Sequence, residues 1–73
     1  MKAIFEFQLP DDQHDYEVMN QASKMKSVLW DFSQQLRSWR KYHQDFKDAS
    51  DALDKIREEF YRLLNDYQVN IDL

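Results

Sequence analysis

Few residues of this chain are suited to catalysis or to metal binding. Its two histidines, His14 and His43, lie in polar segments at opposite ends of the helical hairpin predicted below, and there is no cysteine. The pair His14-Asp15 has the form of a metal-binding dipeptide, but such a site needs several further ligands, and the chain has only one other histidine. We therefore expect no metal and no other cofactor.

Motifs for nucleophilic catalysis and for phosphate binding are also missing. A serine nucleophile needs a sharp turn and an oxyanion hole, and a phosphate-binding loop needs glycine. The chain has no glycine, and none of its serines lies in such a motif: Ser23, Ser27, Ser33, Ser38 and Ser50. The neighbouring carboxylates Glu58 and Glu59 point different ways on a helix, as expected for a solvated face. We predict no catalytic residue and a protein that is not an enzyme.

The clearest candidate binding site is a basic and aromatic cluster. Arg37, Arg40 and Lys41 follow the i, i+3, i+4 spacing of one helix face, and Tyr42 comes next. Cations beside aromatic rings can hold a phosphate and stack a base, which suits a nucleotide or a single-stranded nucleic acid. The favoured alternative is that the cations neutralise the carboxyl end of a helix. Duplex DNA is disfavoured, because the chain has a net charge of −4 and a pI of about 4.9.

Trp30 completes the set of candidate binding residues. An exposed tryptophan is a frequent hot spot of protein–protein interfaces. The alternative, which the sequence favours, is that Trp30 packs in the core beneath a small β-sheet. The two alternatives differ in whether the sheet covers the indole.

Two heptad patterns predict the helices that must position these residues. Each pattern alternates steps of three and four, which places its apolar side chains along one stripe of a helix. The first runs Val18, Ala22, Met25, Leu29, Phe32, Leu36, Trp39, and the second runs Phe46, Ala49, Leu53, Ile56, Phe60, Leu63, Tyr67. We predict helices over about 12–41 and about 46–67 that form an antiparallel hairpin. In the simplest register Phe32 faces Leu53 and Met25 faces Phe60.

Short segments with alternating apolar residues flank the predicted hairpin. Residues 2–9 place aromatic and aliphatic side chains on one side, and residues 69–73 repeat the alternation, so both read as strands. The predicted order is β-α-α-β, an α+β fold in which the hairpin packs against a two-stranded antiparallel sheet. Because two strands leave free edges, we favour a homodimer with a four-stranded sheet.

Helix ends and the connecting turn can also be predicted. Asp11 or Asp12 suits the N-cap of the first helix, and Asp45, Asp48 and Ser50 compete for that of the second. Without glycine, the turn near residues 42–45 needs His43 or another polar residue in the left-handed conformation.

Length and composition restrict the class of protein. At 73 residues the chain is expected to be a single domain, 1–73, with a small core that no disulfide supplements. No apolar run approaches the roughly 20 residues that span a bilayer, and the amino terminus lacks a signal-peptide core, so no membrane partner is expected. Charge is uneven: residues 1–20 sum to −4, residues 21–47 to +4 and residues 48–73 to −4.

Several segments resemble a group of small uncharacterised proteins of tailed bacteriophages. The likeness covers nearly the whole chain and is carried by Met1-Lys2-Ala3-Ile4-Phe5-Glu6-Phe7-Gln8-Leu9-Pro10-Asp11-Asp12, Leu29-Trp30-Asp31-Phe32, Leu36-Arg37, Lys41-Tyr42, Phe60-Tyr61 and Leu63-Leu64-Asn65. The resemblance implies a phage accessory protein made in the cytoplasm of the bacterial host. It transfers no catalytic residue.

Three hypotheses for the function follow. The first is a non-enzymatic accessory protein that binds a host or phage protein and modulates or inhibits a host factor or defence. The second is a nucleotide or single-stranded nucleic-acid binder that uses Arg37, Arg40, Lys41 and Tyr42. The third is a structural or assembly component.

Overall fold

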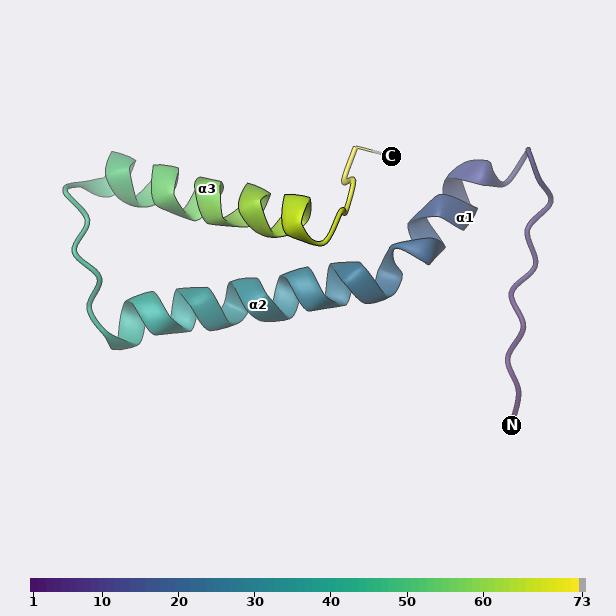
Figure 1. Ribbon diagram of the computed structural model, residues 1–73, viewed down its shortest axis with the longest axis horizontal. Coiled ribbons are helices and arrows are strands. Elements are labelled where there is room, and N and C mark those ends of the chain that lie inside the picture. Colours follow the sequence, from purple (N-terminus) through teal and green to yellow (C-terminus); the bar gives the residue numbers. More distant parts are fainter. Residues whose placement is uncertain (73) are drawn as a thin grey trace.

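The structure, a computed structural model, describes residues 1–72 and contains three helices in that range. They are α1 (Gln13–Asn20), α2 (Ala22–Lys41) and α3 (Ala49–Asp66). In Figure 1, α3 runs back along α2 in the opposite direction, and α1 continues from the start of α2 at an angle. The predicted helical hairpin is confirmed.

The predicted α+β fold is wrong, because residues 1–72 contain helices and no strand. Residues 2–9 are largely extended but pair with no other segment, residues 69–70 are irregular, and residues 71–72 form a turn; residue 73 of the second predicted strand lies outside the described residues. Alternating side chains show only that a segment could be a strand, since a strand also needs a partner for its backbone groups. The predicted sheet, and its extension to four strands in a dimer, are therefore not found in this range.

The first predicted helix is two helices that meet at Gln21. The Gln21 N–H donates to the Val18 carbonyl (3.1 Å), a tighter pairing than that of an α-helix. Its side chain pairs with the backbone of Asn70: Nε2 donates to the carbonyl oxygen (3.2 Å), and the Asn70 N–H donates to Oε1 (2.6 Å). The direction of the chain thus changes where a side-chain amide ties the helices to the C-terminal tail.

The N-caps follow the sequence in part. Asp48 caps α3 by accepting from the Asp51 N–H (2.8 Å), which selects one of the three predicted candidates and starts the helix at Ala49 rather than near residue 46. Asp12 precedes α1 as predicted, but its carboxylate accepts from the Gln8 N–H (2.8 Å) and not from an amide of the first turn.

Both long helices end in a left-handed residue that is not glycine. His43 has φ of 53°, as predicted, and the following Gln44 N–H donates to the Trp39 carbonyl (2.9 Å). After α3, Gln68 has φ of 56°, and the Val69 N–H donates to the Leu64 carbonyl (2.9 Å). These bonds are those of a Schellman motif, which turns the chain back over the last turn of a helix.

The core is small and lies near the carboxyl end of α3. Its buried residues are Val28, Leu63, Leu64 and Val69, and the residues packed against them are Met25, Phe32, Phe60 and Tyr67. The predicted stripes are therefore only partly right: Leu29 and Leu53 are each 66% exposed. Phe32 contacts Phe60, with ring centroids 5.6 Å apart, instead of facing Leu53. The contact partner lies seven residues further along α3 than predicted.

The molecule is more open than a compact monomer of its mass. Its accessible surface is 6489 Å², whereas a folded monomer of 9.0 kDa exposes roughly 4,900 Å². The radius of gyration is 16.8 Å, against roughly 11 Å for a compact domain of this length. The helices are regular, but much apolar surface is left exposed within residues 1–72.

Candidate interaction surfaces

An apolar groove lies where α2, α3 and the C-terminal tail meet. Its volume is about 210 Å³, and all of its lining residues are apolar: Met25, Val28, Leu29, Phe60, Leu64, Val69 and Ile71. Val28, Leu64 and Val69 are buried, whereas Leu29 and Ile71 are exposed. The groove therefore combines a buried floor with an exposed apolar rim.

The wall of this groove formed by the tail is held by backbone geometry. The Schellman motif at Gln68 returns the chain over α3, so that Val69 packs beside Leu64. The paired hydrogen bonds between Gln21 and Asn70 then fix the next residue against the start of α2. Ile71 follows directly and completes the lining.

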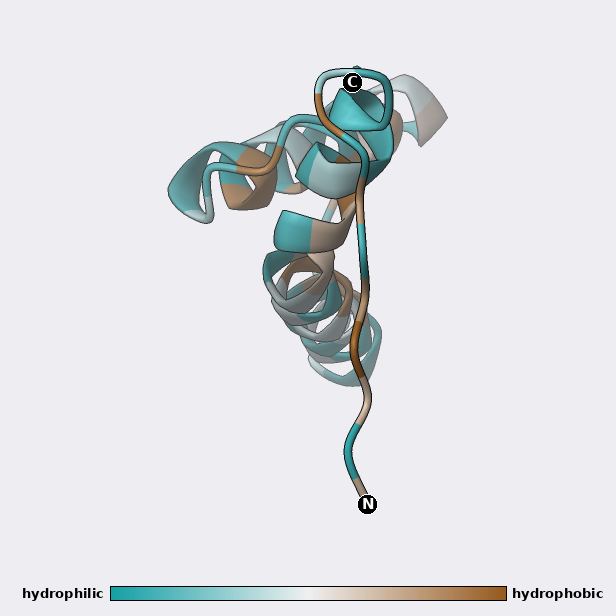
Figure 2. Ribbon diagram, turned by 90° about the vertical axis from the view of Figure 1, so that its right-hand side faces the viewer, coloured by the Kyte–Doolittle hydropathy of each residue, from teal (hydrophilic) through white to brown (hydrophobic). Residues whose placement is uncertain are grey.

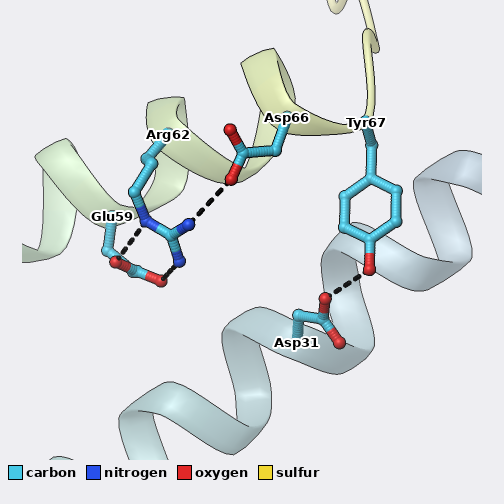
Figure 3. Close-up of polar contacts among 5 residues, drawn as sticks. All are labelled: Asp31, Glu59, Arg62, Asp66 and Tyr67. Atoms are coloured by element: carbon cyan, nitrogen blue, oxygen red, sulfur yellow. Dashed lines mark hydrogen bonds and ion pairs between the residues drawn. The ribbon is translucent and has the colours of Figure 1, made fainter.

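Polar contacts tie α2 to the end of α3. The Tyr67 hydroxyl donates to Asp31 Oδ2 across the two helices (2.5 Å; Figure 3). This hydrogen bond raises the pKa of Tyr67 above its usual value near 10, and desolvation and the charges of Asp31 and Asp66 act in the same direction.

The charged groups next to this contact belong to α3 alone. Arg62 donates through Nε and Nη2 to Glu59 and through Nη1 to Asp66 (2.7 Å; Figure 3). The hydrogen bond and charge of Glu59, followed by those of Asp66, raise the pKa of Arg62. Because its partners lie three and four residues away on one exposed helix face, the cluster reads as support for α3 and not as a reactive site.

Trp30 lies on the outer face of α2 and is 64% exposed. It follows the buried Val28 by two residues, about 200° around the helix. The expected packing of Trp30 beneath strands is not found, because no sheet covers it within residues 1–72. Of the two predicted alternatives, the structure has the exposed indole.

The basic cluster is exposed at the end of α2. Arg37, Arg40, Lys41 and Tyr42 are all exposed, and Lys41 Nζ lies 5.5 Å from the centroid of the Tyr42 ring. Among residues 1–72, none of the three cations forms an ion pair. Trp39, which lies among them in the sequence, is half-buried against Phe46, with ring centroids 5.7 Å apart.

The structure connects two sets of candidates that the sequence treated separately. Trp30, Arg37 and Lys41 are spaced i, i+7 and i+11, so they share one stripe of α2. We call this exposed set the Trp30 stripe. The spacing was visible in the sequence, but the prediction that a sheet would cover Trp30 separated it from the cations.

The sequence did not predict the apolar groove as a site. Leu29 was assigned to the contact between the helices, and Ile71 to a strand. The neighbouring Val28 offered one signal, because it allows a core stripe displaced by one residue from the predicted one.

Other kinds of site find no support in the described part of the chain. Residues 1–72 contain no group of three or more histidine and carboxylate side chains able to hold a metal ion. Their helices all lack the combination of length and apolar character needed to cross a bilayer. Comparison with protein-family models, curated proteins and solved structures finds no match, so the resemblance to phage proteins stays a prediction.

Proposed function

We propose that this protein is a non-enzymatic phage accessory protein. It acts in the host cytoplasm by binding a host protein and altering the activity of that protein. The observation that carries the proposal is the exposed Trp30 on the outer face of a regular 20-residue helix. The phage origin and the cytoplasmic setting derive from the sequence resemblance.

The Trp30 stripe has the composition of an interface centre. Tryptophan and arginine are the residue types most enriched among binding hot spots, and here they lie two helical turns apart on one face. Because α2 is formed without the partner, little conformational entropy is lost on binding. The partner that fits is a protein surface with an apolar pocket for the indole and carboxylates facing Arg37 and Lys41.

The test compares three immobilised chains in a lysate of the host bacterium. Wild type and the control Leu53→Ala, which changes an exposed residue of α3, should retain the same protein, and Trp30→Ala should lose it. With that partner purified, Trp30→Ala should weaken binding by about thirtyfold, as expected for a hot spot worth roughly 2 kcal/mol. Equal affinities of wild type and Trp30→Ala would contradict the proposal.

A second candidate function is binding of a nucleotide or of single-stranded nucleic acid by Arg37, Arg40, Lys41 and Tyr42. The observation that favours it is the set of exposed cations without ion pairs in residues 1–72, one of them stacked near Tyr42. Fluorescence anisotropy with a labelled single-stranded oligonucleotide should then show binding that weakens with salt and with Arg37→Ala. Absence of binding at low salt would remove this candidate.

A further inference from the structure

We propose that the apolar groove is the docking site for the N-terminal segment, residues 1–6, of a second copy of this chain, so that two chains exchange these segments. The groove is distinct from the Trp30 stripe, and the inference does not rest on the proposed function. Three observations carry it: an unpartnered segment, a groove of matching chemistry and a large excess of exposed surface.

The N-terminal segment has apolar side chains that stay exposed in the structure of residues 1–72. Ile4 and Phe5 are 75% and 74% exposed, and no hydrogen bond among residues 1–72 involves residues 1–6. In Figures 1 and 2 the segment extends beyond the helices, and Figure 2 shows hydrophobic residues along it. Such a segment gains most by laying its large side chains against another apolar surface.

The apolar groove suits these side chains. At about 210 Å³ it is smaller than the roughly 300–1,000 Å³ of small-molecule sites, and it lacks the polar groups that orient such ligands. Leu29 and Ile71 on its rim are exposed and would be covered by an inserted side chain. One large residue such as Phe5, with a neighbour on the rim, fits a groove of this size and chemistry.

The segment is directed away from the groove of its own chain. Phe7 packs edge-on against Tyr16, with ring centroids 5.5 Å apart. Gln8 and Asp12 are joined by two hydrogen bonds, from the Gln8 N–H to the Asp12 carboxylate and from the Asp12 N–H to the Gln8 carbonyl (2.8 Å each). These contacts anchor the chain at the far end of α1, and Figure 1 shows the segment leaving there on the side of α1 away from α3. The occupant is therefore assigned to a second copy.

The exposed area is sufficient for a stable dimer. The chain exposes roughly 1,600 Å² more than a compact monomer of its mass, about twice the 800 Å² that each partner buries in a standard interface. We propose that the exchange is reciprocal, each of two copies giving its segment to the other, because such an exchange closes as a two-fold dimer, whereas a segment given to a third copy would continue into a filament.

Cross-linking between single-cysteine chains tests the proposal directly, since the natural chain contains no cysteine. Ala3→Cys chains, which keep Ile4 and Phe5, are mixed with Asp72→Cys chains labelled with heavy nitrogen, which keep the whole lining of the groove, and a short bismaleimide is added. Mass spectrometry should show the mixed dimer. The control pair, Ala3→Cys with Glu58→Cys, places the second thiol beside Asp54 and Tyr61, outside the groove lining, and should give little of it. Far-UV circular dichroism checks that every variant keeps the helical content of the wild type.

The double variant Ala3→Cys/Asp72→Cys, which keeps Phe5 and the groove lining, distinguishes the other possible occupants. Cross-linking within one chain, without mixed dimers, would overturn the proposal in favour of the chain's own segment. Absence of both cross-links would overturn it in favour of a different partner or an empty groove. Neither result bears on the Trp30 stripe.

Sedimentation of full-length variants provides a second measurement. The wild type should sediment as a dimer, and Leu29→Glu should weaken dimerisation by about thirtyfold, because it places a charge on the rim that Phe5 covers. Leu53→Glu, an equally exposed leucine outside the groove, should leave the dimer intact. A monomeric wild type, or equal weakening by both variants, would overturn the proposal.

Discussion

The two ends of the α2–α3 hairpin are built very differently. At the closed end, near the carboxyl end of α3, Val28 and Leu63 are buried, Tyr67 bonds to Asp31, and Gln21 pairs with Asn70. Towards the loop that joins α2 and α3, which we call the open end, the helices diverge in Figure 1. There Leu36 is 40% exposed, and the apolar contact is that of Trp39 with Phe46.

This difference shows what selects the register of a helical hairpin. Both ends carry apolar residues at heptad spacing, so the stripe alone favours neither. Only the closed end adds polar contacts that demand one alignment, together with a helix end that returns Val69 to the core. Apolar burial is not directional, whereas a hydrogen bond between two named groups is.

The largest expected difference between the ends is the cost of truncating a leucine. Leu63 is buried and Leu53 is exposed, although both lie on α3 in the same predicted stripe. Leu63→Ala should lower the free energy of unfolding by about 2–5 kcal/mol, because it removes buried methyl groups and leaves a cavity. Leu53→Ala should change it by less than about 0.5 kcal/mol. Urea denaturation followed by circular dichroism measures both.

The pair of leucine variants is internally controlled. Leucine and alanine are both strong helix formers, so the change in helix propensity is the same small quantity at either position. Equal losses of stability would mean that the hairpin closes in the register predicted from the heptads, with Leu53 against Phe32.

A smaller effect is expected at the two left-handed residues. His43 ends α2 at the open end, and Gln68 ends α3 at the closed end, with φ of 53° and 56°. A residue with a Cβ is disfavoured in this conformation by roughly 1–2 kcal/mol, so Gln68→Gly should stabilise the fold by about 1 kcal/mol, and His43→Gly should stabilise the end of α2 locally by a similar amount. Thermal denaturation measures the gain.

The two glycine substitutions should stabilise different parts of the hairpin. Gln68→Gly acts beside the core and should raise the melting temperature of the whole fold, while His43→Gly should mainly reduce fraying of the loop end, visible in amide hydrogen exchange. Gln44→Gly, at a position without positive φ, is the control and should not stabilise. Stabilisation by the control equal to that of Gln68→Gly would refute the explanation.

The sequence predicted local features of this fold better than distant ones. The amphipathic helices, the N-cap of α3 and the left-handed residue after α2 depend on residues within a turn or two of each other: the hairpin of helices was predicted correctly, and Asp48 and His43 were among the candidates named. The predicted sheet was wrong because strand pairing joins segments at opposite ends of the chain, and alternation in each does not show that they meet. The break at Gln21 likewise depends on Asn70, 49 residues away.

The candidate surfaces also divide into those set by residues close in the sequence and those set by residues far apart. The exposed cations at the end of α2 follow from spacing on one helix, and Trp30 joins them by the same rule. The apolar groove could not be predicted, since it needs the tail residue Ile71 and Leu29 of α2 to line the same space. That arrangement exists only once the Schellman motif and the bonds of Gln21 have placed the tail.

The smallest expected effect concerns the pH dependence of the closed end. The Tyr67 hydroxyl is stabilised in its protonated form by Asp31, which raises its pKa in the folded state above the value near 10 of the unfolded chain. Folding therefore favours the protonated form, and the stabilisation is fully present below about pH 10 and is lost as the pH rises through the higher folded value. Tyr67→Phe removes this contribution altogether. The difference in unfolding free energy between wild type and Tyr67→Phe should thus be constant from neutral pH to about pH 9 and shrink at higher pH.

The control for this titration is Tyr42→Phe at the open end. The Tyr42 hydroxyl donates no hydrogen bond to any carboxylate in residues 1–72, so Tyr42→Phe controls for the loss of a tyrosine hydroxyl that has no such partner. Urea denaturation of the three chains between neutral and alkaline pH gives the comparison. Parallel profiles for wild type and Tyr67→Phe through this range would show that the bond to Asp31 does not form in solution, and the closed end would then be held by apolar packing and by Gln21.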